Sequence, residues 1–222
     1  MNKDSSLSGL SRSQYYFDIA ASYFEQSRYD EAIENLRLSL IHNDKNLPAR
    51  ILLIKNYDII GKKSLAFDEV EKVQNQEFLT SDDIKKISSV LESMSAYNSS
   101  YDLNLKFYEK TGEKSSLWEM YRANLAQAKY IEALDMLDLL EQEKEDDYLL
   151  NIARSEVNFQ LAKYDVALSF LDLAEKSKPL DELILKKKMQ ILSIQEKWSQ
   201  VISLGENYFK YQFHAHFTHR RL

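Results

Sequence analysis

An internal repeat of 34 residues is the feature that most constrains how this chain can fold. Four related tetrapeptides mark it: Tyr-Asp-Glu-Ala at 29–32, Lys-Ser-Leu-Ala at 63–66, Tyr-Ile-Glu-Ala at 130–133 and Tyr-Asp-Val-Ala at 164–167. The alanines of the first two copies are 34 residues apart, and so are those of the last two. Self-similarity at such a period is typical of chains that stack one supersecondary unit many times. A repeat array is therefore predicted.

Two weaker helix starts extend the series, at Tyr101 and Trp198. Trp198 keeps the period, but Tyr101 lies 38 residues after Lys63 and 29 before Tyr130. The spacing predicts an insertion before Tyr101 and a shortened connection after it. Asn104 then occupies the place of the small alanine, so irregular packing is expected there. In total the sequence predicts six helix pairs.

Composition and spacing both favour helices over strands. The 222 residues include only 4 Gly and 2 Pro, the two residues that interrupt helices most strongly. After Ala32, bulky apolar residues return at helical spacing, at Ile33, Leu36 and Leu40. An all-α fold is predicted.

With these residues in place, the chain resembles the tetratricopeptide repeat family, whose helix-turn-helix unit has this period. The first unit matches through Tyr16, Ile19, Ala20, Tyr23, Tyr29, Ala32, Leu36 and Leu40; the second through Leu53, Tyr57, Gly61 and Ala66; the fifth through Ala162, Tyr164, Ala167, Leu171, Ala174 and Pro179. The resemblance implies a right-handed superhelical solenoid of about six antiparallel helix pairs.

This fold implies three segments. A polar N-terminal segment covers 1–12, the repeat domain covers 13–210, and a tail containing His and Arg covers 211–222. The expected repeat units are 13–46, 47–80, 81–113, 114–146, 147–180 and 181–210.

The resemblance also implies a concave groove lined by the first helix of each pair. Residues at those positions are the candidate protein-binding set: Phe17, Phe24, Glu25, Ile51, Lys55, Asp58, Trp118, Arg122, Ile152, Glu156, Phe159 and Lys186. Aromatic side chains near Arg or Lys suit a protein interface, because they give large contact areas and donors for carboxylates. The alternative is that the aromatic members only pack between helices.

Other chemistries find little support in the sequence. The formal net charge of -6 argues against nucleic-acid binding, and the chain has no Cys. The run Gly61-Lys-Lys-Ser64 lacks the leading glycine of a phosphate-binding loop, since Asn56 stands there, and we expect a simple turn. The run 186–188, Lys-Lys-Lys, is expected to be a solvated rim. No catalytic arrangement can be assembled, so no enzyme activity and no cofactor are predicted.

Three histidines near the C-terminus could in principle ligate a metal. His214, His216 and His219 have the spacing His-x-His-x-x-His, which can hold zinc or nickel in a folded chain. Chain ends are generally mobile, however, and we interpret 211–222 as a frayed tail without a metal.

The predicted function is that of a non-catalytic adaptor or scaffold that binds a partner's helix or peptide in the groove. Two alternatives stay open: a regulatory sensor of a peptide or small ligand, and a structural element that self-assembles through the C-terminal repeat, where Trp198, Tyr208, Phe209, Tyr211 and Phe213 gather. No apolar stretch is long enough to span a membrane, so a cytoplasmic location is expected, or a periplasmic one if a leader was removed.

Overall fold

The structure, a computed structural model, describes residues 9–74, 76, 79–143 and 145–218, with the side chains of 211–218 left out of the description. Within these residues the chain is all-α, with twelve helices and no strand. They are α1 (Gly9–Glu25), α2 (Tyr29–His42), α3 (Leu47–Ile59), α4 (Lys63–Gln74), α5 (Ser81–Ser93), α6 (Tyr97–Thr111), α7 (Lys114–Ala126), α8 (Tyr130–Gln142), α9 (Asp147–Gln160), α10 (Tyr164–Ser177), α11 (Glu182–Ile194) and α12 (Trp198–Thr218).

The second helices of the pairs keep the repeat period without interruption. α2, α4, α6, α8, α10 and α12 begin at intervals of 34, 34, 33, 34 and 34 residues. The helix start predicted at Tyr101 is therefore wrong, because α6 begins one turn earlier, at Tyr97. The helix starts keep the period, yet the connection after α6, residues 112–113, is shorter than the four-residue connections that follow α2, α8 and α10, as the sequence suggested.

Two buried polar residues explain this error. Ser100 is fully buried at the place that Ala32 and Ala66 take in the first two pairs, because serine is also small enough for close helix packing. Asn104 then takes the place of the bulky residue one turn later, which is Leu36 in α2. Its Nδ2 donates to Ser88 Oγ at 2.7 Å and to the Ser100 carbonyl at 2.8 Å. The repeat is intact but has polar residues at two core positions.

The turn inside each pair has the same geometry in all six copies. One residue of each turn has a positive φ, and these residues are Ser27, Gly61, Ser95, Ala128, Ala162 and Glu196. The following backbone N–H donates to a carbonyl five residues back, as from Lys62 to Tyr57 at 2.8 Å and from Lys163 to Asn158 at 2.8 Å. This is the Schellman pattern that ends helices in the left-handed conformation. Five of the six turns adopt it without glycine.

Both ends of the repeat array are more helical than the sequence suggested. α1 begins at Gly9, although 1–12 was expected to be a non-repeat segment. Ser13, in the second turn of α1, is buried and bonds Ser39 of α2 at 3.0 Å. α12 continues to Thr218, well into the expected tail, because no Gly or Pro after residue 210 stops it.

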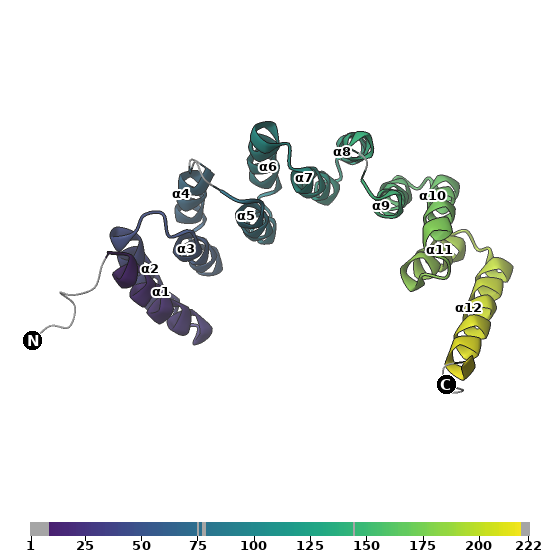
Figure 1. Cartoon of the computed structure of the whole chain (residues 1–222), viewed down its shortest axis with the longest axis horizontal. Coiled ribbons are helices and arrows are strands. Elements are labelled where there is room, and N and C mark those ends of the chain that lie inside the picture. The colour runs from purple at the N-terminus through teal and green to yellow at the C-terminus, as the bar shows by residue number, and fades with distance from the viewer. Residues whose placement is uncertain (1–8, 75, 77–78, 144, 219–222) are drawn as a thin grey trace, which may run out of the picture. The chain divides into compact units, whose positions relative to one another are not determined.

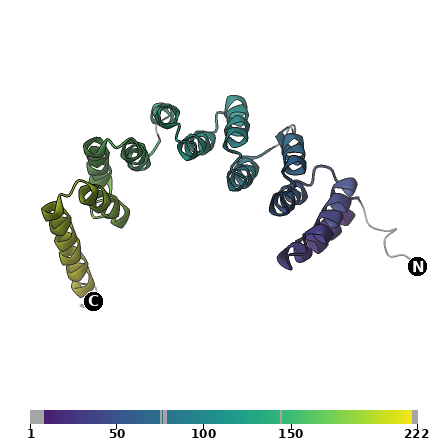
Figure 2. The ribbon, with the colours of Figure 1, turned by 180° about the vertical axis from the view of Figure 1, so that it is seen from behind.

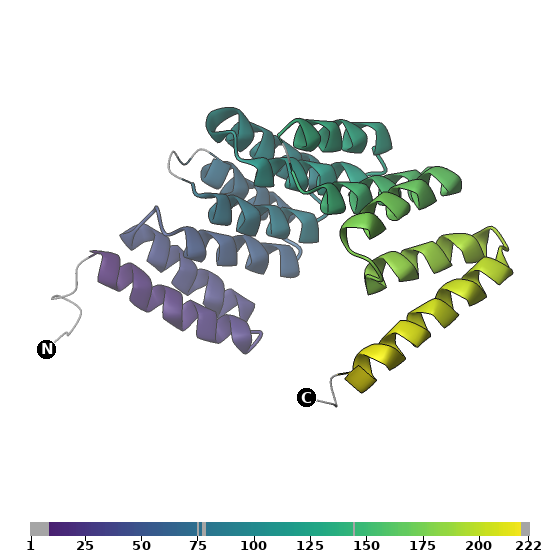
Figure 3. The same cartoon turned by 45° about the vertical axis from the view of Figure 1, so that its right-hand side comes forward.

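By its internal contacts the chain divides into two compact units, residues 1–119 and 120–222, with the boundary inside α7. In unit 1 α1 packs on α2, α2 on α3, α3 on α4 and α5 on α6, and α3 also contacts the first helices α1 and α5. Figures 1 and 2 show α4 and α6 as one layer and α3 and α5 as the other, and Figure 3 shows the helices of this unit running side by side. One apolar core, from Ala20 to Leu103, joins the layers.

Unit 2 follows the same plan. α8 packs on α9, α9 on α10, α10 on α11 and α11 on α12. Its core includes Ala167 and Leu171 of α10 and Ile184 and Ile191 of α11. In this unit the second helix of one pair therefore packs on the first helix of the next pair.

Candidate functional site

Five of the candidate residues occupy one repeated position on the first helices. Phe17, Ile51, Trp118, Ile152 and Lys186 are spaced by the repeat period once a member of α5 is included between Ile51 and Trp118. That member is Lys85, an exposed residue. The sequence prediction missed it because the third pair was placed out of phase, and the start of α6 at Tyr97 supplies the missing register.

In unit 1 the candidates differ in how much of each side chain reaches the surface. Phe17 and Ile51 are half-buried and pack against the core, so each shows only part of its apolar side chain. The half-buried Phe24 packs edge-on against the Tyr29 ring, with ring centroids 5.8 Å apart. The remaining three are charged: Glu25 and Lys55 are exposed, and Asp58 is half-buried.

α7 carries Trp118, which is half-buried, and Arg122, which is exposed one turn later. The neighbouring Tyr121 is 6% exposed, and its hydroxyl lies 3.4 Å from the Ala153 carbonyl oxygen of α9. Burial raises the pKa of Tyr121, with a contribution from Glu156, so its hydroxyl stays protonated and donates. Tyr121 therefore serves the packing of α7 on α9.

In unit 2 an ion pair joins the candidate Glu156 to Lys187, the neighbour of the candidate Lys186. Ile152 and Phe159 are half-buried against the core. Glu156 of α9 accepts a hydrogen bond from Lys187 of α11. Burial opposes ionisation of Glu156, but the hydrogen bonds from Lys187 and Gln160 outweigh it and lower the pKa of this carboxyl. The pair fixes α9 beside α11.

Two lysines of the run 186–188 in α11 differ in exposure and in their partners. Lys186 is exposed and pairs with Glu182 at 2.6 Å. Lys188 is only 6% exposed and reaches Asp172 at 2.5 Å and Glu175 at 2.6 Å on α10. The prediction of a solvated rim is therefore wrong for Lys188. Burial opposes the charged form, but the hydrogen bonds to both carboxylates raise the pKa of Lys188 overall.

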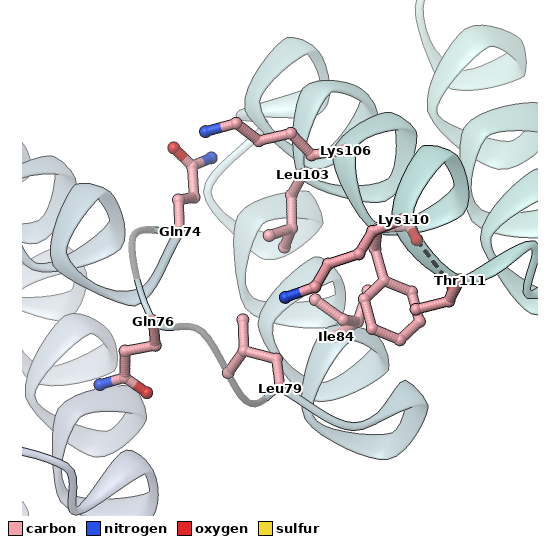
Figure 4. Close-up of a pocket in the computed structure, with 9 residues that line it drawn as sticks. Gln74, Gln76, Leu79, Ile84, Leu103, Lys106, Lys110 and Thr111 are labelled. Atoms are coloured by element: carbon pink, nitrogen blue, oxygen red, sulfur yellow. Dashed lines mark hydrogen bonds between the residues drawn. The ribbon is translucent and has the colours of Figure 1, made fainter.

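Unit 1 also contains a pocket that the sequence did not indicate. It has a volume of about 450 Å³ and lies between the end of α4, the chain before α5, and α6 (Figure 4). Leu79, Ile84, Leu103 and Phe107 give it an apolar lining, and Gln74, Gln76, Lys106, Lys110 and Thr111 complete the wall. The apolar lining comes from residues that are not consecutive, which is why no motif marks it.

The histidines do not form a site in the described part of the chain. His42 stacks on Tyr16, with ring centroids 5.5 Å apart and nearly parallel planes. Of the predicted tail cluster, His219 and the side chains of His214 and His216 lie outside the described residues. Elsewhere in the described chain, no group of three or more His, Cys, Asp or Glu side chains could hold a metal ion. None of the described helices is long and apolar enough to cross a bilayer.

Several solved structures match nearly the whole chain at low sequence identity. A tetratricopeptide repeat protein from Parabacteroides merdae ATCC 43184 has a TM-score of 0.61 at 11% identity, over 90% of this chain and 79% of that one. PilF of Pseudomonas aeruginosa has a TM-score of 0.54 at 14% identity, over 91% and 97%. PilW, described as a widely conserved type IV pilus biogenesis factor, has a TM-score of 0.52 at 13% identity, over 93% and 94%.

No family model matches the sequence, and no curated protein does either. The match to solved structures covers the repeated helix pairs and both compact units. The helix order, the uninterrupted period and these structural matches agree: the chain has the tetratricopeptide repeat fold.

Proposed function

We propose that this protein is a non-catalytic adaptor that binds another protein, as a helix or an extended peptide, on the surfaces of its first helices. One observation carries the proposal. A single repeated position on α1, α3, α7 and α9 presents half-buried apolar side chains, Phe17, Ile51, Trp118 and Ile152, while α5 and α11 present exposed lysines there. Within each unit, this position gives a partner a contact on successive first helices.

The chemistry of these positions suits a peptide. Half-buried aromatic and branched side chains are already held by the core, so they lose little conformational entropy when a partner covers them. Lys55 is exposed one turn from Ile51 on α3 and can pair with a carboxylate of the partner. At 14% identity or less, the matched structures support the fold, and the partner class follows from these side chains.

The first experiment is affinity capture with the full chain from its source cell, followed by mass spectrometry, to identify a partner. Binding of that purified partner is then measured with the variant Trp118→Ala/Arg122→Ala and with the variant Lys55→Glu. We expect each to weaken binding roughly tenfold or more, because central aromatic and charged contacts dominate interface energies.

The matched control for the charge reversal is Lys62→Glu. Lys62 is exposed in the turn between α3 and α4, away from the repeated first-helix position. It should leave the dissociation constant unchanged. Wild-type affinity in both first-helix variants, with their circular dichroism and unfolding unchanged, would refute the proposal.

A second candidate function, self-association, is favoured by the surface of α12. Trp198, Ile202 and Phe209 are 57%, 61% and 74% exposed and recur at helical spacing, so they form an apolar stripe. The equivalent residues of α10, Tyr164 and Leu168, are half-buried. A dimer through α12 predicts a mass that rises with concentration and is restored to the monomer value by Ile202→Glu. A mass that stays at one chain at every concentration excludes it.

A further inference from the structure

One kind of interface recurs inside the chain, between the second helix of a pair and the first helix of the next pair. Three equivalent contacts mark it: Arg37 to Tyr57 between α2 and α3, Asp138 to Arg154 between α8 and α9, and Asp172 to Lys188 between α10 and α11. The helix starts place the three second-helix residues at one repeated position. These contacts show how a first helix of this protein covers a second helix.

α12 exposes the side chains at these positions. Ile202, Glu206 and Phe209, which we call the α12 edge, are equivalent to Leu168, Asp172 and Glu175 of α10. In α10, Asp172 and Glu175 both bind Lys188 of α11, and Leu168 is half-buried. In α12, Ile202 is 61% exposed and Phe209 is 74% exposed. The α12 edge therefore has the position of a surface that a first helix covers elsewhere in the chain.

α1 exposes the opposite half of the same interface. Tyr15, Ile19 and Ser22, which we call the α1 edge, precede the left-handed turn residue Ser27 by the same numbers of residues as Ile184, Lys188 and Ile191 precede Glu196 in α11. The three residues of α11 are buried, as are the equivalent residues of α3, Ala49, Leu53 and Asn56. In α1, Tyr15 is 52% exposed, Ser22 is exposed and Ile19 is half-buried.

The two edges match each other at their apolar positions. Phe209 of α12 has the position of Leu40 in α2, and Ile19 of α1 has the position of Leu53 in α3. Leu40 and Leu53 belong to one apolar core, in which α2 packs on α3. A helix with isoleucine at this position therefore suits α12, because Phe209 and Ile19 can cover each other as the two leucines do.

The contrast with unit 2 supports this match. There the equivalent residues are Glu175 and Lys188, which pair at 2.6 Å. A first helix like α11 would place the ammonium group of a lysine against the apolar ring of Phe209, which would desolvate the charge without a partner. α12 has lost the acid of this pair and α1 has lost the base, so the two changes compensate each other.

A polar contact corresponds as well. Glu206 of α12 has the position of Arg37 in α2, and Tyr23 of α1 has the position of Tyr57 in α3. Arg37 donates to the Tyr57 hydroxyl at 2.8 Å. At the equivalent place between α12 and α1, the Tyr23 hydroxyl can donate to the Glu206 carboxylate, since a phenol is both donor and acceptor. The match thus includes a charged residue of α12 as well as its apolar ones.

We infer that the α12 edge of one copy binds the α1 edge of a second copy, so that the protein associates head to tail. The inference rests on the self-association proposed above and names the surface that α12 binds. An interface between two different surfaces leaves one of each free in a pair of copies, so further copies can add. One helix-on-helix contact is a small interface, and we expect a Kd on the order of 100 μM.

The test measures the mass of the full chain by sedimentation equilibrium up to about 1 mM, well above that Kd. The wild-type mass should rise beyond that of two chains. Tyr15→Glu and Ile202→Glu should each weaken association at least tenfold, because each places a carboxylate in an apolar contact. Tyr15 and Ile202 take the positions of Ala49 and Ile33, which lie in the core of unit 1.

An equal mixture of the two variants distinguishes the modes of association. Tyr15→Glu keeps an intact α12 edge and Ile202→Glu keeps an intact α1 edge, so the mixture should reach the mass of two chains and stop there. This result would also show that both variants fold. If Tyr15→Glu alone associates as the wild type does, α12 binds another surface, which overturns the inference and leaves the self-association of the protein standing.

The matched control is Leu65→Glu on α4. Leu65 is 37% exposed, and the equivalent residues of α2 and α8 are already glutamates, Glu31 and Glu132. It should associate as the wild type does. An equal loss in this control would overturn the inference, because added negative charge alone would then explain the effect. A mixture that stays at the mass of one chain, with the circular dichroism of both variants unchanged, would overturn it too. A wild-type mass of one chain at every concentration would exclude both the inference and the self-association.

Discussion

The two units use buried charge in opposite ways. In unit 1, Arg50 of α3 is 7% exposed and pairs at 2.5 Å with Glu69 of α4, which is 9% exposed, so both partners are buried inside one helix pair. In unit 2, Arg154 of α9 pairs with acidic residues of α8, and Lys188 of α11 pairs with acidic residues of α10. Most of these acidic partners are exposed.

The unit 2 links are themselves periodic. Arg154 and Lys188 are 34 residues apart, and their partners keep the same spacing: Asp138 and Asp172, Glu141 and Glu175. The same ionic link thus joins α8 to α9 and α10 to α11. A buried pair is costly to break from one side, whereas a pair with solvated carboxylates contributes little. Burial, and not the number of charges, decides which unit is more sensitive.

The largest expected effect is that of Arg50→Met. It leaves the buried Glu69 paired with Lys72 at 2.7 Å, and it removes the hydrogen bond from Arg50 to the Asp44 carbonyl. We expect the free energy of unfolding to fall by about 3 kcal/mol, measured by denaturant titration. Lys72→Met, which removes the exposed partner, should cost less than about 1 kcal/mol. Equal losses in the two variants would contradict the role given to burial.

Asn104→Ala should have the next largest effect. It removes two hydrogen bonds to buried partners in unit 1 and opens a small cavity. A loss of about 2 kcal/mol in the free energy of unfolding is expected. Thermal and denaturant unfolding measure it, and a loss below about 0.5 kcal/mol would show that Asn104 is replaceable by any small residue.

In unit 2, Lys188→Met should cost about 1 kcal/mol or less, because Asp172 becomes solvated when its partner is lost and methionine preserves the apolar stem of lysine. The difference from wild type should shrink as salt is raised, since the carboxylates are screened. A loss as large as that of Arg50→Met would break the comparison between the units.

Two ion-paired groups of unit 2, Glu156 and Lys188, should make the free energy of unfolding depend on pH in opposite directions. The pKa of Glu156 is lowered from 4.5, so its contribution is present above that value and is lost as the pH falls through the folded pKa. The pKa of Lys188 is raised from 10.5, so its contribution is present below that value and is lost as the pH rises through the folded pKa. Glu156→Gln should reduce the acid loss of stability, and Lys188→Met should reduce the alkaline loss. Unchanged pH profiles in both variants would contradict these assignments.

The smallest effect should be the same in both units. Ser27 and Ala162 have φ values of 59° and 56° in equivalent turns, a conformation that costs a residue with Cβ more than it costs glycine. Ser27→Gly and Ala162→Gly should each raise the free energy of unfolding by about 0.5 kcal/mol, after the entropy that glycine adds to the unfolded chain. A loss of stability in either variant would show that the turn is not strained there.

The sequence predicted the helix pairs because the small residue of each second helix is usually alanine. It failed in the third pair, because Ser100 is the small buried residue there and does not match an alanine pattern. The helix was therefore predicted to begin at Tyr101 and not at Tyr97. The turns were hard to predict for a related reason. Every pair contains one residue in the left-handed conformation, and among these six residues only Gly61 is a glycine, the residue type that usually indicates this conformation.

The candidate site was predictable where it depends on period alone. Phe17, Ile51, Trp118, Ile152 and Lys186 follow from the register, and Lys85 would have followed from a correct third pair. The pairing of Lys188 with α10 and the apolar pocket could not be predicted, because both depend on how far side chains of different helices reach.

The most direct test of the central claim is hydrogen–deuterium exchange of the full chain with and without its captured and purified partner. Partner binding to the first-helix surfaces predicts slower exchange in peptides from α3, α7, α9 and α11, with little change in α2, α4, α8 and α10. Protection confined to the second helices, or none in the first helices at saturating partner, would contradict the account.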